Sequence, residues 1–308
     1  MTAGAVVFAA GRGKRLRPLT DEVPKPAVPL LDLPLASFAL TALRRAGLRT
    51  LVNVSHLPDI ARSSLEPYAP DAIWFPEPEV PFGTAGTLRE ASRRGFLQGE
   101  VLVWNGDVVA DVDPAALLRE HHRRGAEATA VVEPCSQGAD FLVEDGRAVA
   151  FVDRRRDPQA AGVRFTGISV LTTAALASIP PEGPAGLGET VFGPLARAGH
   201  LAVVETGGTR DVGTLAAFLS VTGRLLDEPP ADPSPPGEIV AVEDGRAYLG
   251  PGASAPDDSL GRGAVLLRGA RVADGTRVER AVVWPGAEVP PGATVADCVW
   301  FRGGCVFP

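Results

Sequence analysis

Apolar positions in the first two-thirds of the chain alternate between two patterns. Short continuous apolar runs, typical of buried strands, lie at residues 5–10, 50–54, 72–75, 101–104, 127–133, 164–171 and 201–205. Stretches with helical spacing lie between them at residues 35–46, 84–94, 114–124, 189–198 and 215–226. This alternation predicts an α/β fold with a doubly wound, Rossmann-like, mostly parallel sheet and helices on both faces.

Several turn and cap residues sharpen these boundaries. Gly47 suits the residue just after a helix, and Asp113 followed by Pro114 suits a helix start. Asp145-Gly146 separates two apolar runs and predicts a tight β-hairpin.

The last third of the chain has a different residue pattern, with a proline-rich stretch followed by six-residue repeats. Residues 228–238 hold five prolines without an apolar period, which predicts a linker. Beyond it, six-residue units start at Leu249, Leu266, Val272, Val283 and Val289, each with glycine at its fourth position. Imperfect hexads of this kind predict a left-handed parallel β-helix with coils of about 18 residues. The expected domains are therefore 1–227, the linker 228–238 and the repeats 239–308.

Composition excludes several function classes. The net charge of −7 argues against nucleic-acid binding, and the 45% apolar content is that of a globular protein. No run of about 18 apolar residues and no leader pattern occur, so neither a membrane span nor a signal peptide is expected. The cysteines Cys135, Cys298 and Cys305 show neither metal-ligand spacing nor a disulfide framework, which predicts a cytoplasmic protein.

A cationic, glycine-rich turn follows the first strand. Residues 11–18 read GRGKRLRP, so a turn suited to phosphate carries four cations in an acidic chain. The spacing fits neither a Walker A loop nor the dinucleotide fingerprint. Only Lys14 and Lys25 among the 30 basic residues are lysines, which indicates positions where arginine does not serve.

The run GxGxRLxPLT at 11–20, followed by VPKP at 23–26, resembles the signature of the sugar-phosphate nucleotidyltransferase family. The resemblance spans roughly residues 3–226, and hexads are a known companion of this family. It implies a Mg²⁺-dependent enzyme that joins a nucleoside triphosphate to a sugar 1-phosphate and releases pyrophosphate. It also leaves open a homo-oligomer formed through the repeats.

The resemblance assigns roles residue by residue. The implied catalytic residues are Arg15, Lys25 and Asp107; the nucleotide-binding residues are Ala10, Gly11, Gly13, Arg15, Glu77, Gly83, Thr84 and Asn105; the sugar-phosphate-binding residues are Gly167, Arg154 and Glu189; and the metal ligands are Asp107 and Asp211. Arg154 stands where the family usually has the lysine of a Glu-Lys-Pro run, so it either replaces that lysine or belongs to a solvated turn.

The base-recognition region favours GTP and mannose 1-phosphate, because the run GTAG at 83–86 resembles the guanylyl branch. Thymidylyl and uridylyl transfer to another sugar 1-phosphate remain alternatives. A glycosyltransferase is a rival because Asp111 and Asp113 form a DxD motif, although Asp113 also reads as a helix cap. A non-catalytic nucleotide-sugar-binding subunit is a further rival.

Overall fold

The computed structural model describes residues 3–154 and 156–308, which form two compact units. The first unit contains the chain up to Arg12 and residues 38–211, and the second contains residues 13–37 and 212–308. This division differs from the boundary expected at residue 227. Residues 13–37 belong to the second unit because they hydrogen-bond with C-terminal residues such as Tyr248 and Arg268.

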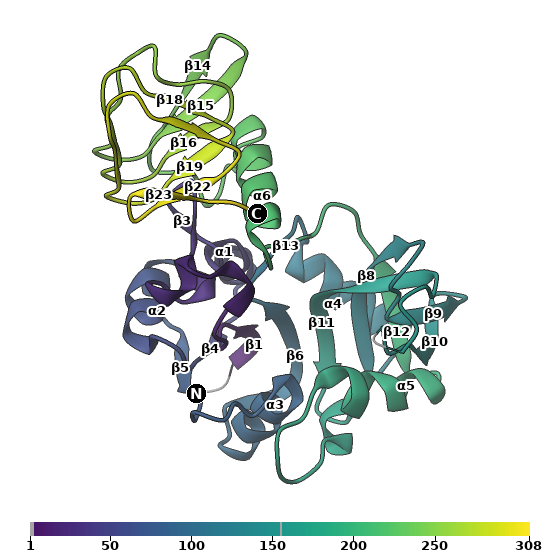
Figure 1. The fold of residues 1–308 in the computed structure, drawn as a ribbon. Helices are drawn as coiled ribbons and strands as arrows, with labels where there is room; N and C mark the ends of the chain where they lie inside the picture. Colours follow the sequence, from purple (N-terminus) through teal and green to yellow (C-terminus); the bar gives the residue numbers. More distant parts are fainter. Residues whose placement is uncertain (1–2, 155) are drawn as a thin grey trace. The chain divides into compact units, whose positions relative to one another are not determined.

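The first unit is built on a nine-stranded sheet (Figure 1). Across the sheet the order is β5 (Ile73–Pro76), β4 (Thr50–Val54), β1 (Ala3–Phe8), β6 (Leu97–Asn105), β11 (Gly162–Thr172), β8 (Ala128–Cys135), β12 (Leu201–Glu205), β10 (Arg147–Phe151) and β9 (Phe141–Glu144). Strands β5, β4, β1 and β6 are parallel, and β12 is parallel to β8.

The α/β prediction is confirmed, and most strands of the sheet run in one direction, but β11 and β10 run opposite to the others, so the sheet is mixed. Strand β11 is antiparallel to both β6 and β8, and β9 and β10 form an antiparallel hairpin. The apolar run of β11 is buried like that of a parallel strand, so its pattern does not encode direction.

Helices cover both faces of this sheet. Their bounds are α1 (Ser37–Arg45), α2 (Pro58–Leu65), α3 (Thr84–Arg93), α4 (Pro114–Arg124) and α5 (Gly193–Arg197), with the short 3-10 helices η4 (Glu66–Tyr68) and η5 (Ala175–Ser178) and the π-helix η6 (Gly188–Phe192). Helix α3 and the η6–α5 segment share one core with Ala128, Ala130 and Val132 of β8. Helix α4 lies on the other face, because His121 hydrogen-bonds to Thr129, whose side chain alternates with those residues.

The hairpin and cap predictions in this unit are confirmed. Asp145 and Gly146 both have positive φ, as a two-residue hairpin turn requires. The side chain of Asp113 caps α4 by accepting a hydrogen bond from the amide of Ala115 at 2.9 Å. Gly47 has a φ of 71°, which suits the end of α1.

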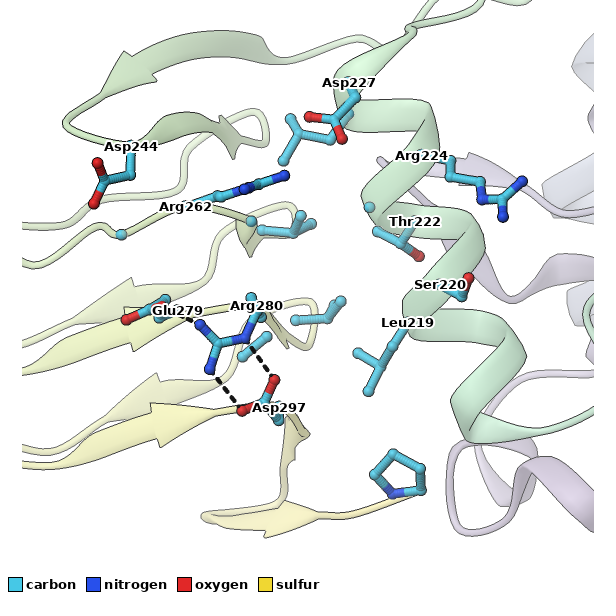
Figure 2. A pocket seen from close by; sticks show the side chains of 18 of the residues that line it. Leu219, Ser220, Thr222, Arg224, Asp227, Asp244, Arg262, Glu279, Arg280 and Asp297 are labelled. Atoms are coloured by element: carbon cyan, nitrogen blue, oxygen red, sulfur yellow. Dashed lines mark hydrogen bonds and ion pairs between the residues drawn. The ribbon is translucent and has the colours of Figure 1, made fainter.

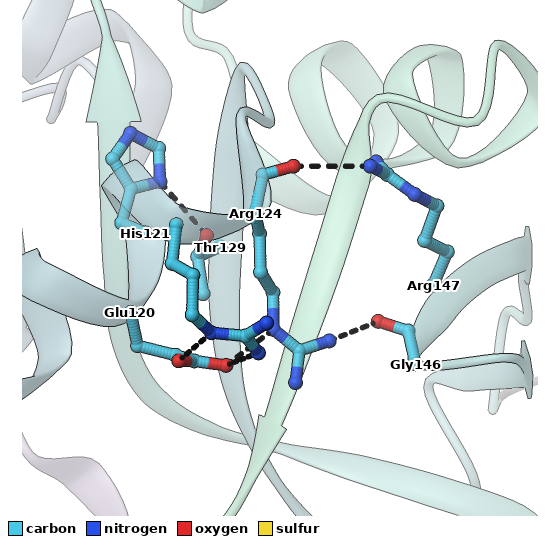
Figure 3. A network of polar contacts seen from close by, with 7 residues as sticks. Glu120, His121, Arg124, Thr129, Gly146 and Arg147 are labelled. Carbon is cyan, nitrogen blue, oxygen red and sulfur yellow. Dashed lines mark hydrogen bonds and ion pairs between the residues drawn. The ribbon is translucent and has the colours of Figure 1, made fainter.

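A polar network joins the end of α4 to that hairpin (Figure 3). Glu120 accepts hydrogen bonds from Arg123 and Arg124, which lower the pKa of its carboxyl to about 2. Arg124 donates to the carbonyl of Gly146, and Arg147 donates to the carbonyl of Arg124. The network therefore fixes the hairpin turn against a helix C-terminus, where arginines are electrostatically favoured.

The second unit begins with the cationic segment. Its elements are η1 (Lys14–Leu16), η2 (Leu19–Asp21), η3 (Lys25–Ala27), β2 (Pro29–Leu30), β3 (Leu33–Pro34) and, after residue 211, α6 (Leu215–Asp227). Thr214 caps α6 by accepting a hydrogen bond from the amide of Ala217 at 3.2 Å. Residues 228–237 contain neither helix nor strand.

The remaining strands of the second unit are short and partly parallel. They are β14 (Glu238–Val242), β15 (Gly245–Leu249), β16 (Ala264–Leu266), β17 (Arg271–Val272), β18 (Arg277–Glu279), β19 (Ala281–Val283), β20 (Glu288–Val289), β21 (Thr294–Ala296), β22 (Val299–Phe301) and β23 (Gly304–Val306). We call residues 238–308 the repeat region. Parallel pairing places Leu249 beside Leu266 and Leu266 beside Val283, a shift of 17 residues rather than the expected 18. Each coil of the repeat region is therefore one residue shorter than three hexads, which explains why the hexads are not evenly spaced in the sequence.

The hexad pattern correctly identifies the interior of the repeat region. Leu266, Val272, Val283 and Val289 are buried in one core, with Leu249 packed against it. The fourth-position glycines all have φ between 68° and 73°. Glycine suits these corners because it adopts positive φ without steric cost.

A cavity of about 1040 Å³ lies between α6 and the repeat region (Figure 2). Leu219 and Thr222 of α6 line one side of it, and Arg262 and Arg280 line the other. Asp297 holds Arg280 through two hydrogen bonds of 2.7 and 2.8 Å, so this arginine is part of a fixed ion pair.

The cysteine prediction is wrong at two positions. Cys298 and Cys305 form a disulfide across the β22–β23 hairpin, with Cα atoms 5.7 Å apart, while Cys135 is a free thiol. The two cysteines are only seven residues apart, and they can form a disulfide because the β22–β23 hairpin places them across from each other. Within the described part of the chain, no helix is both long and apolar enough to cross a membrane.

Candidate active site

The end of β1 is held by a buried asparagine of the first unit. Asn53, at the end of β4, accepts hydrogen bonds from the amides of Ala9 and Ala10 at 2.7 and 3.2 Å. Its own amide donates to Glu77 at 2.7 Å. The amide of Ala10, a residue expected to bind the nucleotide, is therefore already engaged, and the turn beginning at Gly11 starts from a fixed strand end.

Glu77 is the hub of this cluster. One carboxylate oxygen, Oε1, accepts hydrogen bonds from Asn53 and from the hydroxyl of Thr87. The other oxygen, Oε2, has no hydrogen-bonding partner within residues 3–154 and 156–308. Neither Asn53 nor Thr87 was assigned a role from the sequence, although the runs that contain them resemble segments of the guanylyl branch.

The loop from Gly83 is anchored to the chain around Ala185. The amides of Ala85 and Gly86 donate to the Ala185 carbonyl at 2.9 and 3.2 Å, and the Thr84 hydroxyl accepts from the amide of Leu187 at 3.0 Å. Gly83 has a φ of 75°, and a Cβ there would lie 2.5 Å from the Ala185 oxygen. Only glycine fits this approach, so the loop enters α3 in one fixed direction.

The two proposed metal ligands come together through a small antiparallel pair. Strand β7 (Val108–Val109) pairs with β13 (Arg210–Asp211), and Asp211 lies directly opposite Val108, the neighbour of Asp107. Trp104 supports this pair because its indole N–H donates to the Val108 carbonyl at 3.1 Å. Asp107 is half-buried and Asp211 is exposed.

This donor set is small. The described residues contain no group of three or more histidine, cysteine, aspartate or glutamate side chains placed to hold a metal. Two carboxylates on adjacent strands fit Mg²⁺, which commonly takes one or two protein carboxylates and completes its coordination with phosphates and water.

Asn105 and Gly167 form a second close approach beside this pair. Gly167 has a φ of 93°, and a Cβ there would lie 2.6 Å from Nδ2 of Asn105. The adjacent Thr166 fixes the strand by donating to the Val131 carbonyl at 2.9 Å. Asn105 therefore ends β6 beside Gly167, which lies in the middle of β11, while Asp107 and Asp211 belong to the neighbouring β7–β13 segment.

Arg154 occupies a more structural position than the sequence indicated. Its Nε lies 2.8 Å from Oδ1 of Asp140, whose other oxygen accepts the amide of Phe165 at 2.9 Å. Burial raises the pKa of the Asp140 carboxyl, and the Phe165 amide and the charges of Arg154 and Arg164 oppose that rise. The bond to Asp140 orients the Arg154 guanidinium. Asp140 was not a sequence candidate.

Glu189 lies in η6, in the first turn of the η6–α5 segment. A Cβ on Gly186 would lie 2.7 Å from its Oε2, so the carboxylate lies close to the backbone of the loop before it.

In the second unit, the cationic turn is packed on its own segment. Gly13 has a φ of 56°, and a Cβ there would lie 2.9 Å from Thr20 and 3.0 Å from the Cβ of Lys25. Thr20 donates to the Gly13 carbonyl at 3.0 Å. Arg15 is exposed and Lys25 is half-buried, so the turn holds two cations at fixed backbone positions.

The rival DxD motif has a structural explanation for one of its members. Asp113 is the helix cap of α4 and also lies 3.8 Å from Arg119. A capping carboxylate already committed to backbone and arginine is a poor metal ligand, which weakens the glycosyltransferase alternative.

Comparison with known proteins gives consistent results. A family model described as nucleotidyl transferase matches residues 4–228. The chain is 30% identical to a mannose-1-phosphate guanylyltransferase of Mycobacterium tuberculosis over 305 residues, which cover 94% of this chain and 82% of that protein. It is 26% identical to a UTP–glucose-1-phosphate uridylyltransferase of Synechocystis, covering 97% and 82% of the two chains. It is also 32% identical to a mannose-1-phosphate guanylyltransferase catalytic subunit beta of Dictyostelium discoideum, covering 72% and 64%.

Proposed function

The chain belongs to the nucleotidyl transferase family, and on that premise we propose that it joins GTP to mannose 1-phosphate, giving GDP-mannose and pyrophosphate. The observation that carries the reaction class is the β7–β13 pair, which sets Asp211 beside the neighbour of Asp107. The pairing brings the backbones of two aspartates from distant parts of the chain close together, and Mg²⁺ binding is the task we propose for them.

In the proposed reaction, a phosphate oxygen of mannose 1-phosphate attacks the α-phosphorus of GTP in line with the departing oxygen. One P–O bond forms as the α–β bridge bond breaks, and the electron pair leaves with pyrophosphate. Arg15 and Lys25 bind the phosphates and offset their charge in the transition state, while Gly11 and Gly13 let the backbone approach them. Mg²⁺ held by Asp107 and Asp211 would neutralise charge on the α-phosphate and the leaving group.

The sugar phosphate is assigned to Gly167, Arg154 and Glu189. Glu189 accepts hydrogen bonds from sugar hydroxyls, and Gly167 leaves the space that the Asn105 side chain occupies. Arg154, oriented through its Nε by Asp140, offers its remaining nitrogens to the phosphate. A planar fork suits phosphate, which is why arginine can replace the family lysine here.

The base preference is assigned to Glu77 together with the Gly83–Thr84 loop. Oε1 of Glu77 is held by Asn53 and Thr87, so Oε2 is the acceptor offered to a ligand. Guanine presents two adjacent donors, N1–H and the 2-amino group, whereas uracil and thymine present one N–H between two carbonyls. A fixed carboxylate acceptor therefore favours GTP.

Glu77→Gln is expected to weaken the preference for GTP over UTP. The glutamine carbonyl can turn inward and keep both internal hydrogen bonds, which leaves an amide donor facing the base. We expect kcat/KM for GTP to fall by roughly 10²-fold, the usual cost of an unpaired polar group of about 1–3 kcal/mol, with a smaller loss for UTP. Glu79→Gln is the matched control because this neighbouring carboxylate is exposed. Equal losses for GTP and UTP would contradict base recognition by Glu77.

Pyrophosphate release across a grid of nucleoside triphosphates and sugar 1-phosphates, with and without Mg²⁺, tests the proposed function. We expect metal-dependent turnover that is highest with GTP and mannose 1-phosphate. Highest turnover with UTP and glucose 1-phosphate would transfer the assignment to the uridylyl alternative, which the similarity to the Synechocystis enzyme supports. Nucleotide-sugar binding without turnover of any pair would identify a non-catalytic subunit.

The proposal also includes the fold of the repeat region, the cellular compartment and self-association of the chain. The 17-residue spacing and the parallel ladders of the repeat region support a left-handed parallel β-helix. We assign the enzyme to the cytoplasm, where nucleoside triphosphates are available, with self-association through the repeat region.

A further inference from the structure

The hairpin that follows Lys25 has an unusual turn. Strands β2 and β3 are joined by Leu31 and Asp32, both with positive φ, 49° and 62°. Non-glycine residues in this region are strained by about 1–3 kcal/mol and persist where their surroundings hold them. Leu31 is completely buried, so packing within the second unit holds this turn.

A polar anchor secures the turn to the repeat region, within the same unit. The amide of Arg268 donates to Oδ1 of Asp32 at 2.9 Å. The buried Tyr248 hydroxyl lies 3.0 Å from both Oδ2 of Asp32 and the Leu31 carbonyl, and it accepts the amide of Gly237 at 3.1 Å. Burial raises the pKa of Tyr248 and of Asp32, so the hydroxyl keeps its proton and donates it to the turn.

The anchored hairpin is in turn bonded to the residues around Lys25. The amide of Leu35 donates to the Val28 carbonyl at 3.0 Å, and the amide of Ala36 donates to the Pro26 carbonyl at 2.9 Å. The amide of Val28 closes the Lys25 turn at 3.1 Å. A continuous series of hydrogen bonds therefore runs from Asp32 to the backbone of Lys25, whose Cβ packs beside Gly13.

A second contact joins the repeat region to the segment that precedes Lys25 in the chain. Arg302, in the turn between β22 and β23, donates to Glu22 at 2.7 Å. This pair is exposed, and exposed pairs contribute little free energy, about 0–1 kcal/mol. The buried anchor at Asp32 is therefore the dominant restraint.

We propose that Asp32 is a positioning residue, through which the repeat region fixes the β2–β3 hairpin and so the backbone of Lys25. The proposal rests on the proposed function in one respect, namely that Lys25 binds the reacting phosphates. The repeat region then contributes to turnover without touching substrate. A displacement of about 1 Å at such a cation can cost on the order of 10²-fold in rate.

Three variants and a control test this in the full-length chain. Asp32→Ala removes both acceptors, and Tyr248→Phe removes the proton donor. Asp32→Asn preserves the geometry, because its oxygen can accept from Arg268 and its amide can donate to Tyr248, which then donates to Leu31. Asp297→Asn is the control, since this carboxylate pairs with Arg280 in the repeat region without contacting the hairpin.

Two readouts are measured: steady-state kinetics with both substrates varied, and hydrogen exchange at the amides of Val28, Leu35 and Ala36. We expect Asp32→Ala and Tyr248→Phe to lower kcat about tenfold or more, with a smaller effect on the KM for the sugar phosphate, and to accelerate exchange at all three amides. Asp32→Asn should restore both, and Asp297→Asn should change neither.

Accelerated exchange with unchanged kcat would overturn the proposal, because Lys25 would then be positioned independently of the hairpin. Reduced kcat with unchanged exchange would overturn it as well, because the effect would not pass through the hairpin. Failure of the proposed function is a separate result, seen as absence of turnover in the unmodified chain. Unchanged exchange in Asp32→Ala would overturn the anchor whatever the activity.

Discussion

Replacement of either Asp107 or Asp211 by alanine is expected to abolish turnover while the melting temperature stays nearly unchanged. The β7–β13 pair brings their backbones together, and both carboxylates are needed if they share one Mg²⁺. Neighbouring carboxylates repel each other without a metal, so their removal should cost little stability. Added Mg²⁺ should restore little activity, because the position of the metal is lost as well as its occupancy.

Turnover and thermal unfolding of each variant, measured at several Mg²⁺ concentrations, provide the comparison. Asp111→Ala is the matched control, an exposed aspartate in the same stretch of chain. An active Asp107→Ala or Asp211→Ala variant would exclude shared coordination. Loss of activity in Asp111→Ala instead would revive the DxD interpretation.

Lys25→Arg should be nearly as damaging as Lys25→Ala, with turnover lost by about 10²-fold or more. The chain uses arginine for all but two of its cations, and Lys25 is one of the two lysines. Its Cβ packs beside Gly13 in a close turn, so a longer, planar guanidinium starts from a fixed point and misplaces its charge.

Single-turnover rates of the two Lys25 variants distinguish a slower chemical step, caused by misplaced charge, from weaker binding of the substrates. Lys14→Arg provides the comparison, because Lys14 is exposed and has room for the larger group. A Lys25→Arg protein that turns over like the unmodified chain would show that the lysine is incidental.

The sequence predicted most elements of the first unit, because their signals are local. The cap at Asp113, the hairpin turn at Asp145 and Gly146, and the α3 start at Thr84 all depend on residues close together in the chain. The direction of β11 was missed, since burial on both faces gives the same apolar run in either orientation. Helix α2 was also missed, because it is short and follows a turn at Leu57 with positive φ.

Within the candidate site, the sequence likewise proposed some residues and left out others. Asp107 and Asp211 were proposed from resemblance, and the structure places Asp211 opposite Val108, the neighbour of Asp107. The supporting residues Asn53, Thr87 and Asp140 were not assigned roles, because their roles follow from side-chain contacts that no sequence pattern specifies, such as that of Asn53 with Ala9, 44 residues away. The disulfide between Cys298 and Cys305 was missed for a similar reason, since its geometry depends on a hairpin whose turn has no simple sequence signal.

The interleaving of the two units also constrains the order in which the chain can fold during synthesis. Asp32 leaves the ribosome early, but its partner Arg268 is made 236 residues later. Until then the β2–β3 hairpin lacks the bonds that hold its strained turn, while the sheet of the first unit can already assemble from β1 and residues 38–211. A nascent chain released before the repeat region emerges would therefore carry a formed sheet and an unanchored Lys25 segment, so phosphate-binding competence would arise as one of the last events of biosynthesis.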